Sequence, residues 1–265
     1  MVASADLSRD LYSPALIDLL ECLWGRGWLS PGGPEEVARM LGGLDLRGRT
    51  ILDIGCGAGG VDLALVERHG AGHVTGVDVE QGVLARARAR VAAAGLDDRI
   101  RLLQVAPGPL PFAPASFDAV FSKDAIVHIA DKDAVMREAY RVLRPGGLLL
   151  ASDWLIGHEG PPSPEMAAYI EAEGLGFGMA SPARYAAALA TAGFRDVEID
   201  SRNAWYRRRA RRELTLLQGA LRSRIAAAVG EEFVARNIAV WSMMLPLLDS
   251  GEHSPTHLRA RKPAG

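Results

Sequence analysis

Short apolar segments alternate with helix-like segments through the middle of the chain. The apolar segments are predicted as strands because they are brief, rich in Val, Ile and Leu, and bounded by glycine or proline. They lack regular polar alternation, which is typical of strands covered on both faces. They span residues 50–54, 73–79, 99–105, 117–122 and 148–154. Alternation of strand and helix predicts an α/β fold with a mostly parallel sheet and helices on both faces.

Both flanks of this block are predominantly helical in pattern. Residues 13–25 and 34–41 are predicted helices that precede the first strand, and Ser181-Pro182 begins another helix that stops at Gly193. A strand at 194–199 follows, then a helical stretch over 204–249 and a last strand at 257–260. The predicted organisation is an N-terminal helical cap (1–45), an α/β core (46–202), a helical insertion (203–253) and a final strand with tail (254–265).

Composition narrows the class of protein. With 265 residues, 49% of them hydrophobic, and a net charge of −2, the chain is expected to form a globular core and not a generally basic nucleic-acid binder. The N-terminus lacks the apolar segment of a secretory signal, and no apolar run approaches a membrane span. We therefore expect a cytoplasmic protein with no membrane partner. Only Lys123, Lys132 and Lys262 are lysines among 30 basic residues, which indicates a GC-rich bacterial genome.

Glycines cluster where the first predicted strand meets its helix. Gly55, Gly57 and Gly60 match the G-x-G-x-x-G pattern, in which glycine lets the backbone approach a ligand closely. Asp78 ends the second predicted strand, about 20 residues later, where a carboxylate accepts hydrogen bonds from ribose hydroxyls. The pattern also describes a tight strand-to-helix turn, but its agreement with Asp78 favours a nucleoside cofactor, either NAD(P) or S-adenosylmethionine.

Asp53 discriminates between these two cofactors. A carboxylate two residues before the first glycine is unfavourable beside a pyrophosphate but suits the cationic methionyl end of S-adenosylmethionine. The Tyr-x-x-x-Lys pattern of short-chain dehydrogenases is absent, because no tyrosine is followed by lysine four residues later. No histidine or cysteine spacing suits metal ligation, so no metal is predicted. An NAD(P)-dependent oxidoreductase of Rossmann type remains the alternative.

The run TILDIGCGAGG, the acidic end of the second strand and the stretch SKDAIVHIAD resemble the class I S-adenosylmethionine-dependent methyltransferases. The general resemblance covers about residues 47–200. More narrowly, the chain is similar to phosphoethanolamine N-methyltransferases over nearly its whole length, through residues 12–33, 122–131 and 144–154. This resemblance implies a seven-stranded sheet of Rossmann-like type, helical lids over the acceptor and a transferable methyl group.

The glycine loop and the resemblance together give a set of expected cofactor contacts. Trp28 and Ser30 belong to a loop that lines the cofactor in the family. The family usually has an acid after the third strand, where it meets the adenine amino group, but Ala106 stands there. The predicted cofactor-binding residues are Asp53, Gly55, Cys56, Gly57, Asp78, Val79, Val105, Ala106, Ser122, Trp28 and Ser30.

His128, Tyr12 and Asp124 are the predicted catalytic residues. The resemblance implies that His128 lies on the acceptor side, where a neutral imidazole accepts a proton, and that Tyr12 pairs with it to close the site. Asp124 is expected near the acceptor and the sulfonium, where it favours an amine or cationic acceptor. Two alternatives stay open: Tyr12 packs on the core, and Asp124 caps a helix.

The predicted acceptor pocket departs from the family. Leu175 and Phe177 stand where the family has an arginine and a tyrosine for the substrate phosphate, and Trp154 replaces another tyrosine. An apolar or aromatic acceptor is therefore expected in place of phosphoethanolamine. Arg207, in an arginine-rich run that otherwise resembles a solvated helix face, is a candidate for an acidic substrate group.

These observations predict a methyltransferase that acts on a nitrogen or oxygen of a small molecule in bacterial secondary or small-molecule metabolism. Nitrogen is slightly favoured by the resemblance. A catalytically silent S-adenosylmethionine-binding scaffold is a further alternative, and neither the acceptor nor the oligomeric state follows from the sequence.

Overall fold

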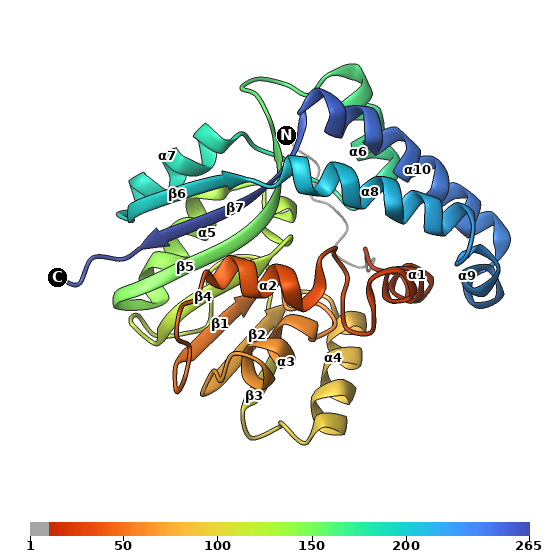
Figure 1. The fold of residues 1–265 in the computed structure, drawn as a ribbon. Coiled ribbons are helices and arrows are strands. Elements are labelled where there is room, and N and C mark those ends of the chain that lie inside the picture. The colour runs from red at the N-terminus through yellow and green to blue at the C-terminus, as the bar shows by residue number, and fades with distance from the viewer. Residues whose placement is uncertain (1–10) are drawn as a thin grey trace.

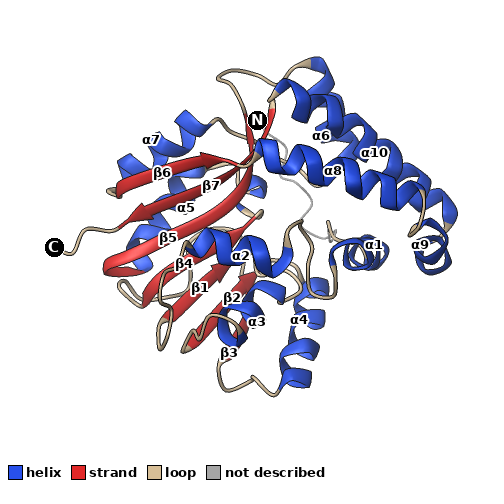
Figure 2. Ribbon diagram, in the orientation of Figure 1, coloured by secondary structure: helices blue, strands red, loops and turns tan. Residues whose placement is uncertain are grey.

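A seven-stranded sheet forms the centre of the molecule and helices cover it (Figures 1 and 2). The computed structural model describes residues 11–265, so the first ten residues of the predicted cap lie outside the described residues. The strands are β1 (Thr50–Ile54), β2 (His73–Asp78), β3 (Ile100–Gln104), β4 (Phe117–Lys123), β5 (Leu143–Ile156), β6 (Arg195–Ser201) and β7 (His253–Arg261). The helices in the described part are α1 (Pro14–Trp24), α2 (Gly33–Leu41), α3 (Gly60–Glu67), α4 (Gln81–Ala94), α5 (Lys132–Val142), α6 (Pro164–Glu173), α7 (Pro182–Ala192), α8 (Asn203–Gln218), α9 (Arg222–Val229) and α10 (Glu231–Ser250), with one 3-10 turn, η1 (Ile126–His128).

The strand order is β3-β2-β1-β4-β5-β7-β6. Neighbouring strands from β3 to β5 are parallel, whereas β7 runs antiparallel to both β5 and β6. This arrangement confirms the predicted seven-stranded, mostly parallel sheet. The carboxyl ends of β1, β2, β4 and β5 meet along one edge, which is where open α/β sheets bind ligands.

Side chains of the central strands alternate between two buried faces. Ile51, Val74 and Phe121 pack with α2 and α3 on one face, whereas Leu52 and Val120 pack with α5 and α7 on the other. Because both faces are apolar, the central strands show no polar alternation in sequence. That reasoning does not extend to β3 and β6, which are edge strands with several exposed residues.

A third apolar cluster joins α1, α6, α8, α9 and α10. Figure 1 shows these helices beyond the carboxyl edge of the sheet. Helix α6 was not predicted. It lies within residues 46–202, the range expected to form the core, yet its buried Met166 and Tyr169 belong to this helical cluster. We call these five helices the lid. None of the described helices has both the length and the apolar character needed to cross a bilayer.

Two strands begin four or five residues before their predicted starts, whereas the other strand bounds differ by at most two residues. Strand β5 begins at Leu143 rather than Leu148, because residues 144–147 (RPGG) bulge out of the ladder: Phe117 pairs with Leu143, and the next paired residues are Ala119 and Leu148. Strand β7 begins at His253, four residues before the predicted start.

Candidate active site

The glycine-rich turn after β1 is held tightly against β2. The N–H groups of Gly55 and Cys56 donate to the carbonyl of Val77 at 2.8 and 3.1 Å. Gly55 and Gly57 have φ values of +75° and +52°, which favour glycine. A Cβ at Gly55 would collide with Ala125, so the turn also packs against the loop after β4. The predicted cradle is therefore present at the carboxyl edge of the sheet.

The third glycine of the pattern serves a different contact. Gly60 donates its N–H to the carbonyl of Gly27 at 3.1 Å, and a Cβ on Gly60 would lie only 2.5 Å from that oxygen. The same Cβ would lie 3.1 Å from Trp28, which is half-buried against the start of α3. Because Gly60 has no side chain, the loop that follows α1 can pack directly against the glycine-rich turn.

Asp78 lies beside the cradle at the end of β2. One of its carboxylate oxygens accepts a hydrogen bond from the N–H of Gly57 at 2.9 Å. Val79 next to it is 48% exposed, one of the two most exposed large apolar residues in the described chain. Val105 donates its N–H to the Asp78 carbonyl, and Ala106 is exposed. The structure therefore places four predicted residues together at the ends of β2 and β3, one of them acidic and three apolar: Asp78, Val79, Val105 and Ala106.

Asp53 is fully buried beneath the cradle, and neither of its carboxylate oxygens has a hydrogen-bond partner among the described residues. Burial raises its pKa well above the usual value, and the nearby Asp62 and Asp78 raise it further. A buried carboxylate without a partner is unfavourable unless a cation approaches it. The cationic amino group of S-adenosylmethionine fits this requirement, so the residues present suit the expected cofactor. Asp62, which sequence reasoning missed, is also buried, and its carboxylate oxygens have no hydrogen-bond partner within residues 11–265.

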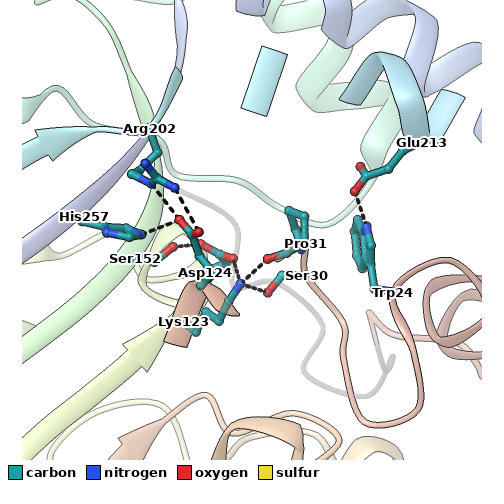
Figure 3. Close-up of polar contacts among 10 residues, drawn as sticks. Trp24, Ser30, Pro31, Lys123, Asp124, Ser152, Arg202, Glu213 and His257 are labelled. Atoms are coloured by element: carbon teal, nitrogen blue, oxygen red, sulfur yellow. Dashed lines mark hydrogen bonds and ion pairs between the residues drawn. The ribbon is translucent and has the colours of Figure 1, made fainter. Parts of the chain in front are cut away.

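Lys123, at the end of β4, is the centre of a buried polar network (Figure 3). Its ammonium donates to the Ser30 hydroxyl at 2.7 Å, to the Pro31 carbonyl at 2.9 Å and to the Asp124 carboxylate at 2.7 Å. The second oxygen of Asp124 accepts from the Ser152 hydroxyl at 2.5 Å. The network ties the N-terminal loop to β4 and β5. Nothing in the local sequence pattern singled out Lys123.

This network revises the expectations for Asp124 and Ser122. The charge of Asp124 is balanced by Lys123 and is not free for an acceptor cation. Asp124 does not cap a helix either, because η1 begins after Ala125 and has no side-chain cap. Ser122, predicted to contact the cofactor, is fully buried, and its hydroxyl donates to the Ile54 carbonyl at 2.8 Å.

Tyr12 and His128 meet as predicted, although 116 positions separate them in the sequence. The Tyr12 hydroxyl lies 3.4 Å from Nε2 of His128, and the two rings meet edge to face. His128 Nδ1 lies 2.8 Å from the carbonyl of Leu175, an acceptor, so Nδ1 carries the proton. Burial lowers the His128 pKa below its usual value. The imidazole is therefore neutral near pH 7, with the lone pair of Nε2 facing Tyr12.

Backbone contacts hold both members of this pair. Glu80 accepts hydrogen bonds from the N–H groups of Leu11 and Tyr12 at 2.8 and 3.0 Å, which anchors the N-terminal segment two residues beyond Asp78. The turn η1, which carries His128, is fixed by Asp153, which accepts from the N–H of Val127 at 3.0 Å.

A cavity of about 50 Å³ lies between Tyr12 and the lid. Its aromatic lining includes Tyr12, Trp24, Trp154, Tyr169, Phe177, Tyr206 and Trp241. Trp154, Leu175 and Phe177 line it as predicted. Arg207 does not, which corrects its assignment to the substrate: its partly exposed side chain forms an ion pair with Asp249 of α10 at 3.0 Å.

Other polar contacts fix the lid and were not predicted (Figure 3). Trp24 donates its indole N–H to Glu213 at 2.8 Å, which joins α1 to α8. Arg202 and His257 flank the buried Glu36 at 2.7 and 2.9 Å. Burial opposes ionisation of Glu36, but these two partners lower its pKa to about 2. Within residues 11–265, no group of three His, Cys, Asp or Glu side chains is placed to hold a metal ion.

Comparison with known proteins adds evidence from outside the chain. Residues 51–147 match a family described as a methyltransferase domain. The chain is 35% identical over 195 residues to phosphoethanolamine N-methyltransferase 1 of Triticum aestivum, which is 73% of this chain and 38% of that protein. It is 36% identical over 154 residues to the 27-O-demethylrifamycin SV methyltransferase of Amycolatopsis mediterranei, covering 54% of this chain and 56% of that protein.

A solved structure extends the likeness to nearly the whole chain. Phosphoethanolamine N-methyltransferase 2 of Haemonchus contortus, in complex with phosphomonomethylethanolamine and S-adenosylhomocysteine, superposes with a TM-score of 0.89 and 26% identity. The alignment covers 97% of this chain and 60% of the other. The chain thus spans less than two thirds of the length of each of these relatives. Together, the fold, the glycine cradle with Asp78 and these comparisons identify a class I S-adenosylmethionine-dependent methyltransferase domain in this chain, which resembles the phosphoethanolamine N-methyltransferases.

Proposed function

We propose that this chain transfers a methyl group to a nitrogen or oxygen of a small molecule in bacterial secondary or small-molecule metabolism. The observation that carries the proposal is the neutral His128, whose unprotonated Nε2 faces the hydroxyl of Tyr12, a residue that lines the aromatic cavity. The wheat relative is named as an N-methyltransferase, and the Amycolatopsis relative is named for an O-demethyl substrate. The proposal therefore includes both nitrogen and oxygen as acceptor atoms.

S-adenosylmethionine supplies a methyl group on a cationic sulfur. Gly55, Gly57 and Asp78 would hold this cofactor at the carboxyl edge of the sheet, and its methyl group would be the one that the acceptor takes up. The proton that the acceptor loses passes to His128 Nε2, directly or through the Tyr12 hydroxyl. The lid and the Lys123 network orient the acceptor and exclude water, which is how such enzymes lower the barrier to in-line transfer.

Substitution of the pair tests this proposal. His128→Ala should lower turnover by roughly 10²–10⁴-fold and leave the affinity for S-adenosylhomocysteine almost unchanged, because His128 would act on the acceptor's proton. Tyr12→Phe should give a smaller loss of the same kind. The exposed His158 offers a matched control, since His158→Ala removes an imidazole remote from the cavity lining.

The assay is release of S-adenosylhomocysteine across amine, phenol and carboxylate acceptors, with calorimetry for cofactor affinity. Full turnover in His128→Ala would show that His128 is structural. Binding of S-adenosylhomocysteine without release from any acceptor would favour the silent scaffold. Binding of NAD in its place would contradict the cofactor assignment.

A further inference from the structure

One acidic side chain in the cavity wall forms no ion pair with any described residue. Glu173 is the last residue of α6, and one of its oxygens accepts a hydrogen bond from the Tyr169 hydroxyl at 3.1 Å. Arg236 influences it at longer range but does not line the cavity. A carboxylate at the C-terminal end of a helix also faces the negative end of the helix dipole. Its position therefore calls for a positive charge from elsewhere.

Aromatic rings surround the same space. Trp154 and Tyr206 have ring centroids 4.9 Å apart, and His253 lies 5.2 Å from Trp154 and 5.6 Å from Tyr169. All four line the cavity. His253 does not supply a positive charge, because burial lowers its pKa to about 3. A carboxylate beside several aromatic rings is a favourable setting for an ammonium group.

The remaining charges in the cavity do not balance Glu173. Asp124 also lines it, and Lys123 is already paired with that residue. Among the described residues that line the cavity, none is a lysine or an arginine. An acceptor with a phosphate group would bring more negative charge to Glu173 without a cationic partner, whereas an amine would supply the missing charge.

We propose that Glu173, with Trp154, Tyr169 and Tyr206, binds a cationic nitrogen of the methyl acceptor, which is therefore a small amine or ammonium compound without a phosphate group. This inference rests on the proposed function, and it deepens it by naming the acceptor class. Glu173 acts here as a specificity-determining residue that contacts the acceptor, and Tyr169 orients its carboxylate.

Choline and 3,3-dimethylbutan-1-ol are suitable probes, because they have nearly the same shape and differ in charge. Binding can be followed by tryptophan fluorescence in the presence of S-adenosylhomocysteine, since Trp24, Trp154 and Trp241 line the cavity. The native protein should bind choline about tenfold more tightly than the neutral alcohol. Phosphocholine should bind more weakly than choline.

Glu173→Gln should remove this preference while leaving the affinity for the alcohol unchanged. Glu171→Gln is the matched control, because Glu171 lies on the same helix but is exposed and does not line the cavity. Equal binding of choline and the alcohol by the native protein would overturn the proposal. So would a choline preference that survives in Glu173→Gln, or tighter binding of phosphocholine.

A measurement on the native protein avoids any folding defect of the variant. Burial raises the Glu173 pKa to about 7, so choline affinity should increase several-fold between pH 6.5 and pH 8 as the carboxylate ionises. Tyr12, Tyr169 and Tyr206 stay protonated over this range because burial raises their pKa values, and His253 stays neutral. The charged groups nearby are Asp124, which is paired with Lys123, and Arg236, which acts at longer range. Choline affinity that does not change with pH would contradict the proposal.

These binding tests do not depend on methyl transfer. Choline binding that is sensitive to Glu173, without S-adenosylhomocysteine release from any acceptor, would reject the proposed function and retain the cation site. If S-adenosylhomocysteine is released only with neutral or anionic acceptors and the protein shows no preference for choline, the cation site is rejected and the proposed function is retained.

Discussion

The carbonyl of Leu175 sets the protonation of His128, since it accepts the Nδ1 proton and leaves Nε2 as the basic atom. Leu175 stands where the resemblance places a phosphate-binding arginine. Its side chain cannot bind phosphate, but its backbone carbonyl fixes the tautomer of His128. This separates two tasks at one position: the side chain of Leu175 shapes the acceptor cavity, and its main chain orients the proposed base.

The pH dependence of turnover follows from this environment. Burial lowers the His128 pKa below 6.5, although the Leu175 hydrogen bond opposes the shift. Because the neutral ring is the active form, kcat should stay constant from pH 8 to about 6.5 and fall only at lower pH. A pH–rate profile with the best acceptor measures this. A fall that begins above pH 7 in the native protein and is unchanged in His128→Ala would assign the titration to another group.

Lys123 is predicted to be a stabilising residue whose effect depends on Asp124. Lys123→Met leaves a buried carboxylate without its cation and removes the donor to Ser30 and Pro31, which should lower the free energy of unfolding by about 3–5 kcal/mol. Chemical denaturation measures this loss. The double variant Lys123→Met, Asp124→Asn should be less destabilised than the single one. Lys262→Met is the control for loss of a lysine that donates to two backbone carbonyls but has no carboxylate partner among the described residues. Equal losses in the single and double variants would show that the ion pair is not the cause.

At the scale of elements, three helices share one N-terminal signal. Helices α1, α6 and α7 each begin with Ser-Pro, and the serine hydroxyl accepts a hydrogen bond from the N–H three residues later. Ser181-Pro182 was used to predict α7. The same pattern at Ser163-Pro164 could have predicted α6, but its few buried residues give it a weak apolar periodicity. The helix that carries Glu173 was therefore missed for a physical reason.

The contact between the N-terminal loop and α3 gives a test at this scale. Alanine normally stabilises a helix relative to glycine by about 1 kcal/mol. At Gly60 the added Cβ would lie 2.5 Å from the Gly27 carbonyl oxygen, so Gly60→Ala should lower the melting temperature and weaken S-adenosylhomocysteine binding. Thermal melting and calorimetry check both effects. A variant more stable than the native protein would show that the loop is not held there.

For the whole molecule, the cofactor edge and the acceptor side are linked through the N-terminal segment. Gly27 and Gly60 join the N-terminal loop to the cradle, and Glu80 anchors Leu11 and Tyr12 beside Asp78. Binding of S-adenosylhomocysteine should therefore slow hydrogen exchange in residues 11–31 as well as in residues 54–60.

Hydrogen-exchange mass spectrometry with and without S-adenosylhomocysteine measures this coupling. Helix α7 is the internal control, because it packs on the far part of the sheet with α5 and β6. Protection confined to residues 54–60 and 78–80 would show that the two sides are independent.

Features that arise from residues close together in the sequence were predicted, whereas side-chain contacts between distant segments were missed. The central strands, the glycine turn and Asp78 have local signals, and the resemblance supplied Tyr12 and His128. The contacts of Lys123 with Ser30 and of Trp24 with Glu213 join residues 93 and 189 positions apart, so no local pattern reveals them. Arg207 was assigned wrongly because its residue type says nothing about the side of α8 on which it lies.

The segment between β6 and β7, which forms most of the lid, leaves and re-enters the sheet at adjacent points. Ser201 on β6 pairs with Thr256 on β7, and Arg202 donates its N–H to the Pro255 carbonyl at 2.7 Å. The pairing of β6 with β7 therefore holds the two ends of the intervening segment together. The entropic cost of closing such a segment changes only slowly with its length. Residues 203–252 can therefore be replaced by other helical segments in the course of evolution. Such a change would alter the acceptor cavity while the pairing of β6 with β7 and the cofactor side of the sheet stay the same.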